Sequence, residues 1–291
     1  MHELAALYWN PSRFLFWIPL IHVPVTWYGL LFSTGFLSGF YLFRFQLCRE
    51  LSADAANACA EKLSCYLIVA TIVGARLGHI IFYENPFEYF LSPISILKTW
   101  EGGLASHFGI LANVIAIWVF AKKVCCKWPS LNFLHLLDLL VIPALFVGCL
   151  IRLGNFMNQE ILGIPTDMPW GIIFGNPLSG EEVVARHPAQ LYESGIYLLL
   201  FCIFGFLWQL CKLNHLNQGF VVGINCVIVG VLRFFVEYFK VGQSVWFDYR
   251  HYPINMGQLL SLPMIFFGLF LLVSQEKNFV KIFFRKWDDG S

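Results

Sequence analysis

The chain has 291 residues, of which 58% are hydrophobic and only 13% are charged. Its mean hydropathy is +0.67, whereas a soluble domain usually carries about 25% charged residues. This composition excludes an ordinary soluble domain and predicts an all-α polytopic membrane protein. The net charge of +1 offers no basic surface of the kind that binds nucleic acid, so nucleic-acid binding is excluded as well.

The first apolar stretch covers residues 13–22, contains Trp17 and Pro19, and is too short to cross a bilayer. We predict an interfacial helix there. A membrane-spanning helix needs about 20 mostly apolar residues. Seven later segments meet this requirement and predict seven transmembrane helices: 25–45, 65–83, 103–121, 134–150, 190–210, 219–239 and 256–274.

The distribution of lysine and arginine predicts the orientation of these helices. Most of these residues fall after the first, third and fifth segments and in the tail at 275–291. Cytoplasmic loops are enriched in lysine and arginine, so we expect the N-terminus outside and the tail in the cytoplasm. The longest outer connection, 152–189, carries several prolines and predicts a small head between the fourth and fifth helices of a single 1–291 transmembrane domain.

Polar side chains gather near the outer ends of the predicted helices. The block at 151–163 reads I-R-L-G-N-F-M-N-Q-E-I-L-G. Arg76 and Arg233 lie inside helices, and Glu237 follows Arg233 by four residues, so both lie on one helix face and can form an ion pair. Ionisable groups near hydrocarbon need partners or a polar ligand. The ligand that this pattern favours is a phospholipid headgroup.

Each of these polar residues also has a purely structural interpretation. Arg152 can extend to the interface, the Arg233–Glu237 pair can be structural, and His107 can be a hydrogen-bonded core residue. Neighbouring arginines favour the neutral, proton-accepting form of His107, which supports a chemical role. The start of the fifth helix is expected to line the wall of the site with three residues: Gln190, Tyr192 and Glu193.

Six strings in this order resemble bacterial prolipoprotein diacylglyceryl transferases. They are W-Y-G at 27–29, G-A-R-L-G at 74–78, W-E-G-G at 100–103, the block at 151–163, R-H-P-A-Q-L-Y-E at 186–193 and R-F-F-V-E at 233–237. The fourth and fifth strings are the most specific. Two positions depart from the family pattern, because Ile151 and Phe108 stand where the family usually has glycine, which adds bulk beside expected catalytic residues.

The resemblance implies a seven-helix enzyme of the bacterial inner membrane with a periplasmic N-terminus and a cytoplasmic C-terminus. Such an enzyme transfers the diacylglyceryl group of phosphatidylglycerol to the lipobox cysteine thiol of a prolipoprotein. The reaction forms a thioether, releases glycerol phosphate and is the first step of lipoprotein maturation. The expected partners are phosphatidylglycerol and the prolipoprotein signal peptide, and neither a cofactor nor a metal is implied.

The chemistry of this reaction suggests a role for each polar residue. Guanidinium groups bind phosphate oxygens in bidentate fashion, so Arg152 and Arg233 are expected to hold the departing phosphate, with Arg76 in support. Cysteine reacts as a thiolate, and His107 is the expected general base. The remaining residues are expected to bind the lipid. The glycerol hydroxyls of its headgroup are expected to contact Asn155, Asn158 and Glu160. Tyr28 and Glu237 are expected to position the lipid in the cavity.

A membrane transporter or flippase for an anionic lipid or solute is the alternative, since charged groups inside helices are expected there too. Transport needs a polar path to both leaflets, often with repeated halves and broken helices. The polar groups of this chain lie mainly at one end of the predicted helices. This distribution favours the enzyme.

Overall fold

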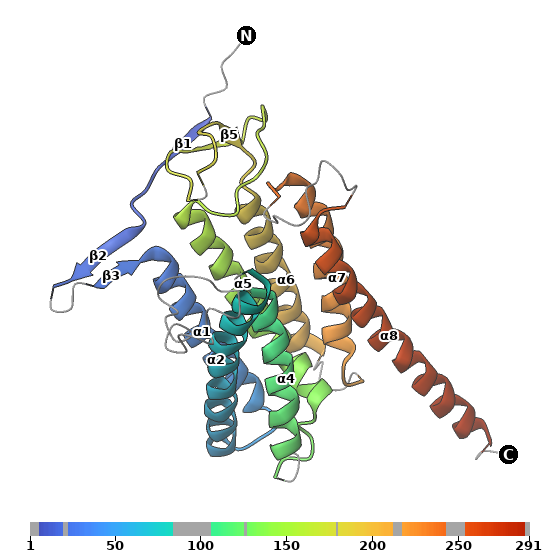
Figure 1. Cartoon of the computed structure of the whole chain (residues 1–291). Coiled ribbons are helices and arrows are strands. Elements are labelled where there is room, and N and C mark those ends of the chain that lie inside the picture. Colours follow the sequence, from blue (N-terminus) through green and yellow to red (C-terminus); the bar gives the residue numbers. More distant parts are fainter. Residues whose placement is uncertain are drawn as a thin grey trace. The chain divides into compact units, whose positions relative to one another are not determined.

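The computed structural model describes residues 6–19, 23–83, 106–124, 127–178, 180–211, 217–242 and 254–288. This part of the chain is mainly helical, as expected, and holds seven long α-helices (Figure 1). They are α1 Trp27–Leu47, α2 Ala53–Tyr83, α4 Ser106–Val124, α5 Phe133–Asn158, α6 Ala189–Cys211, α7 Phe220–Val236 and α8 Met256–Asp288. Five of them, namely α2, α5, α6, α7 and α8, are long and apolar enough to cross a membrane. For α1 and α4 the crossing stays a prediction.

The fourth predicted helix is longer at its C-terminal end than the sequence analysis expects. Helix α5 continues through the polar block and ends at Asn158, so the predicted end at residue 150 is wrong. The polar residues do not end the helix because Arg152, Asn155 and Asn158 are spaced by three. This spacing places them along one helix face, where each finds a polar partner.

The N-terminal stretch forms strands instead of the predicted interfacial helix. Strand β2 (Phe14–Ile18) pairs antiparallel with β3 (Val23–Thr26), which leads directly into α1. The helix predicted at 13–22 is therefore wrong over the described residues, and residues 20–22 lie outside them. Aromatic and β-branched side chains favour strands, and Pro19 would weaken a helix because it lacks the N–H that a helix interior uses.

A second small sheet covers the end of α5. Its strands follow the order β1-β4-β5, with β1 (Leu7–Trp9) parallel to β4 (Ile172–Phe174) and β4 antiparallel to β5 (Ala185–Arg186). The ring of Trp9 lies 4.7 Å from that of Phe156 in α5. The buried residues beneath this sheet are Phe156, Leu162, Ile172 and Phe174. The connection between α5 and α6 is thus folded onto the helix end that carries the polar block.

The chain divides into two compact units, one of residues 1–39 and 141–291 and the other of residues 40–140. In the first unit α7 packs along α8, and in the second α2 packs along α4. At the second contact a Cβ on Gly78 would overlap the side chain of Phe108. The glycine at position 78 therefore leaves space for the side chain of Phe108.

Candidate active site

The last two turns of α5 carry a chain of hydrogen bonds. Arg152 donates from Nη1 to Oδ1 of Asn155 at 3.0 Å, and Asn155 donates from Nδ2 to Oε1 of Glu160 at 2.8 Å. Asn158 donates from Nδ2 to the same carboxylate oxygen at 3.3 Å. The structure therefore brings together all four predicted polar residues of this block.

The backbone after α5 turns so that Glu160 comes back toward the helix. The N–H of Glu160 donates to the carbonyl of Asn155 at 3.1 Å, and the N–H of Gln159 donates to that of Phe156 at 3.2 Å. This pair of bonds is the Schellman motif that ends many helices. Gln159 and Ile161 have φ values of 54° and 57°, which are costly for residues other than glycine and therefore need support from surrounding structure.

Glu193, in the second turn of α6, is the centre of an ion-pair cluster. Its carboxylate is 1% exposed and lies 2.8 Å from Nε of Arg152 and 3.0 Å from Nζ of Lys240. The Nη1 atom of Arg233 lies 3.8 Å away. Neither Glu193 oxygen meets hydrogen-bond geometry with these donors, so the contacts are ion pairs. One buried carboxylate thus gathers three cations from the end of α5, the end of α7 and the residues that follow α7.

Arg233, in the last turn of α7, and Lys240, which follows the short 3-10 helix η4 (Glu237–Phe239), have further partners. Nη1 of Arg233 donates to the hydroxyl of Tyr197 at 3.3 Å, and a quarter of the Arg233 side chain is exposed. Nζ of Lys240 donates to Oε2 of Glu237 at 3.1 Å. Glu237 thus forms an ion pair with Lys240. The ion pair between Glu237 and Arg233, which their spacing of four residues allows, is not formed within the described residues.

Tyr28, in the first turn of α1, packs against the polar face of α5. A Cβ on Gly154 would lie 2.8 Å from Cδ2 of the Tyr28 ring. The phenol is also close enough to interact electrostatically with Glu160 and Arg152. The structure therefore brings this predicted residue to the same site.

Backbone hydrogen bonds tie the ends of α5, α6 and α7 together around Gly163. The N–H of Ile164 donates to the carbonyl of Phe239 at 2.9 Å, and the N–H of His187 donates to the carbonyl of Ile164 at 3.1 Å. A Cβ on Gly163 would collide with the carbonyl oxygen of His187 and lie 2.8 Å from that of Phe239. Only glycine lets these three segments approach so closely.

An imidazole lies beside this junction, just before α6. His187 is buried, and its Nδ1 is 3.0 Å from the hydroxyl of Tyr192. Its ring also packs edge-on against Phe239 at a centroid distance of 5.0 Å. Burial lowers the pKa of His187 below its usual 6.5, because removal from water disfavours the charged form. Burial therefore favours the neutral form of this imidazole.

The model of the prolipoprotein diacylglyceryl transferase family matches residues 15–274 of this chain. The chain belongs to this family. It is 40% identical over 272 residues to the phosphatidylglycerol–prolipoprotein diacylglyceryl transferase of Tolumonas auensis, which covers 94% of this chain and 98% of the relative. The enzyme of that name from Chlamydia caviae is 41% identical over 279 residues, 92% of each chain. That from Chlamydia trachomatis is 40% identical over 281 residues, 94% of this chain and 99% of the relative.

These comparisons confirm the family and the enzyme class that the sequence motifs indicate. A diacylglyceryl transferase fits them better than a transporter or flippase, because the family and its relatives carry the name of a transferase. The five apolar helices agree with a multi-pass membrane enzyme.

Two of the predicted site residues, Arg76 and His107, belong to the second unit. Arg76 is buried in α2. His107 lies in the first turn of α4, and its side chain is outside the part that the structure describes. The roles of both residues in the diacylglyceryl transferase stay predictions.

The sequence analysis missed the importance of Lys240 and Tyr197 and gave Glu193 only a place in the cavity wall. A signal for Lys240 was present, because Arg233, Glu237 and Lys240 are spaced by four and three residues. This spacing places all three on one face of a continuing helix. Tyr197 follows Glu193 by four residues on α6, and this spacing likewise places the two side chains on one helix face.

The arrangement suits an anionic ligand. Guanidinium groups from two helix ends converge, and partly exposed Arg233 leaves this cluster open to a ligand. Within the described residues no group of three metal-binding side chains gathers, and the three cations of the cluster would repel a metal ion. A phosphate ester matches both the charge and the hydrogen-bonding pattern of these groups.

Proposed function

We propose that this chain transfers the diacylglyceryl group of phosphatidylglycerol to the lipobox cysteine of a prolipoprotein and releases glycerol phosphate. The observation that carries the proposal is the gathering of Arg152, Arg233 and Lys240 around the buried Glu193. The relatives of this chain are named for the same reaction.

The cation cluster would stabilise the leaving group. A phosphodiester carries one negative charge, and further negative charge develops on its leaving oxygen as the carbon–oxygen bond breaks. Arg152 and Arg233 offer fixed donors for these oxygens, with Arg76 in support. Donors that are already oriented in a water-poor site stabilise developing charge more strongly than water does. Glu193 would keep them oriented before the lipid arrives.

The reaction forms one bond and breaks one bond. The thiolate sulfur of the lipobox cysteine attacks the carbon of the diacylglyceryl group that is bonded to the phosphate oxygen, and the electron pair of this carbon–oxygen bond leaves with glycerol phosphate. The thiol proton passes to a base, for which His107 is the candidate. No cofactor or metal takes part in this scheme.

The remaining polar residues would bind the headgroup. Asn155, Asn158 and Glu160 form a connected set of amide and carboxylate groups, which suits the two free hydroxyls of the glycerol. Tyr28 and Glu237 flank this set and would position the lipid.

The proposed topology has seven membrane-spanning helices in the bacterial inner membrane. The N-terminus and the 152–189 head would face the periplasm, and the 275–291 tail would lie in the cytoplasm. The excess of lysine and arginine on the cytoplasmic side of this arrangement supports it. The signal peptide would then present its lipobox cysteine at the outer end of the helices.

The direct test is to incubate the purified protein with phosphatidylglycerol and a lipobox peptide and to measure the diacylglyceryl adduct by mass spectrometry. Arg152→Ala and Arg233→Ala should each abolish the adduct while circular dichroism shows a folded protein. Arg49→Ala is the matched control, because this exposed arginine lies in the other unit. Full activity in either cluster variant would overturn the phosphate-binding role, and absence of the adduct with the unmodified chain would overturn the proposed reaction.

A further inference from the structure

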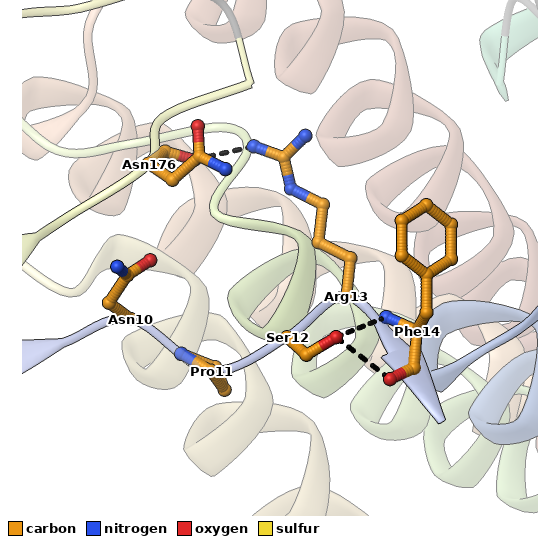
Figure 2. A pocket seen from close by; sticks show the side chains of 6 residues that line it. All are labelled: Asn10, Pro11, Ser12, Arg13, Phe14 and Asn176. Carbon is orange, nitrogen blue, oxygen red and sulfur yellow. Dashed lines mark hydrogen bonds between the residues drawn. The ribbon is translucent and has the colours of Figure 1, made fainter. Parts of the chain in front are cut away.

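The N-terminal segment and the connection between α5 and α6 line an open pocket at the base of the β2–β3 hairpin. Its volume is about 330 Å³, which is within the usual range for a small-molecule site. Figure 2 shows the side chain of Arg13 reaching toward Asn176 across the pocket. The lining residues are Asn10, Pro11, Ser12, Arg13, Phe14 and Asn176.

Arg13 supplies a positive charge, and the described residues place no carboxylate beside it. Its Nη2 donates to the backbone carbonyl of Asn176, which is a neutral acceptor. Its Nε is buried without a hydrogen-bond partner, and among the described residues Arg13 has no carboxylate within ion-pair distance. A guanidinium with unused donors favours a phosphate or carboxylate ligand.

The hairpin above Arg13 has the character of a membrane-interface element. Phe14, Phe16 and Trp17 are each about half exposed, at 46%, 57% and 56%. The N–H of Trp27, the first residue of α1, donates to the carbonyl of Arg13 at 3.1 Å. Since α1 is predicted to enter the bilayer, Arg13 would lie at the depth of the headgroups, where aromatic side chains are enriched.

Gln159 joins this pocket to the turn that holds Glu160. Its Nε2 donates to Oδ1 of Asn10 at 3.3 Å, and its Oε1 accepts the N–H of Asn176 at 2.7 Å. Gln159 is fully buried and immediately precedes Glu160. Gln159 thus forms hydrogen bonds with both Asn10 and Asn176, which line the pocket, and it lies beside the candidate active site.

We propose that this pocket binds the phosphate ester of an anionic phospholipid headgroup, with Arg13 as the main ligand. The site is separate from the Glu193 cluster and would hold a second lipid next to the reacting one. It differs from a site for free phosphate because the aromatic hairpin would contact the acyl region of the same lipid. Its occupation is measured without peptide, so it does not depend on the transfer reaction.

Native mass spectrometry of the purified protein in detergent with added phosphatidylglycerol tests this site. The unmodified chain should retain one more lipid than Arg13→Gln at the same lipid concentration, because loss of one charge-assisted contact weakens binding by about tenfold. Arg13→Lys should retain most of the binding. Arg49→Gln removes the same charge from the other unit and should leave the lipid count unchanged.

A second variant, Asn10→Asp, tests the pocket independently in case Arg13→Gln does not fold. Asn10→Asp keeps the oxygen that accepts from Gln159 and adds a negative charge to the pocket, so it should lose the same lipid. Equal lipid counts for the unmodified chain, Arg13→Gln and Asn10→Asp would overturn the proposal. So would equal retention of phosphatidylcholine, or displacement of the lipid by an equal concentration of inorganic phosphate, which would identify a free-anion site.

The transfer assay adds a kinetic readout. In vesicles with a low fraction of phosphatidylglycerol, Arg13→Gln should raise the apparent KM for the lipid by about tenfold and leave kcat unchanged, because Arg13 does not contact the reacting atoms. A fall in kcat with constant KM would contradict a lipid-supplying role. Failure of the unmodified chain to form the adduct would overturn the proposed reaction. The number of lipids retained in native mass spectrometry would still test the pocket by itself.

Discussion

Substitution of Glu193 by glutamine tests whether one buried carboxylate organises the candidate active site. The change keeps the shape of the side chain and removes its charge from between Arg152, Arg233 and Lys240. Removal of one member of a buried ion pair costs about 3–5 kcal/mol. Each cation keeps a second partner, in Asn155, Tyr197 or Glu237. We therefore expect the lower end of that range, about 3 kcal/mol.

This free energy translates into two measurable effects. In a protein of this size about 3 kcal/mol lowers Tm by about 6–12 °C, which thermal unfolding in detergent detects. If the displaced cations no longer hold the phosphate, the same energy slows transfer to the lipobox peptide by about 100-fold. Glu193→Asp keeps the charge but shortens the side chain, so it should show a smaller loss of both quantities.

Glu182→Gln is the matched control for this experiment. Glu182 is exposed in the head, and its backbone carbonyl, not its carboxylate, accepts from Arg186. The control should leave Tm and the transfer rate unchanged. A Glu193→Gln protein with the Tm and rate of the unmodified chain would refute the organising role of this carboxylate.

Three further predictions concern His107, Gly163 and His187. His107→Ala should preserve phosphatidylglycerol binding and slow the chemical step, and a pH–rate profile identical to that of the unmodified chain would place the base elsewhere. Gly163→Ala should lower Tm and abolish transfer because a Cβ collides with the His187 carbonyl; normal activity would contradict the tight junction. NMR should show His187 titrating below 6.5 because burial lowers its pKa. The folded state then binds fewer protons than the unfolded state, so stability falls as pH drops below about 6.5, and His187→Gln should remove this part of the pH dependence. A titration midpoint at or above 6.5 would contradict it.

Much of the candidate site follows from patterns within single helices. Arg152, Asn155 and Asn158 are spaced by three, and this local periodicity already places them on one face. The polar block and the R-H-P-A-Q-L-Y-E string also indicate the family, which the comparison confirms. The hydropathy of the chain likewise predicts seven spans, each of which overlaps one of the seven long helices of the described residues, although several bounds differ.

Other features depend on contacts between segments that are distant in the sequence. The strands β2 and β3 replace a predicted helix because each supplies the hydrogen bonds of the other, and a short apolar run does not distinguish the two structures. Helix α5 extends beyond its predicted end for a related reason. Its polar residues are stabilised by partners in the following turn and in α6.

The sequence by itself determined that this is a helical membrane protein of the transferase family and which side chains of each helix share a face. The family follows from its resemblance to specific sequence strings. Composition and a repeat of 3.6 residues are sufficient for the membrane class and the helix faces, because both act within one segment. Only the tertiary structure decided that Glu193 is the common partner of Arg152, Arg233 and Lys240. The relative rotation and depth of packed helices decide such a meeting, and they arise from close packing among all of the helices together, which no single segment encodes.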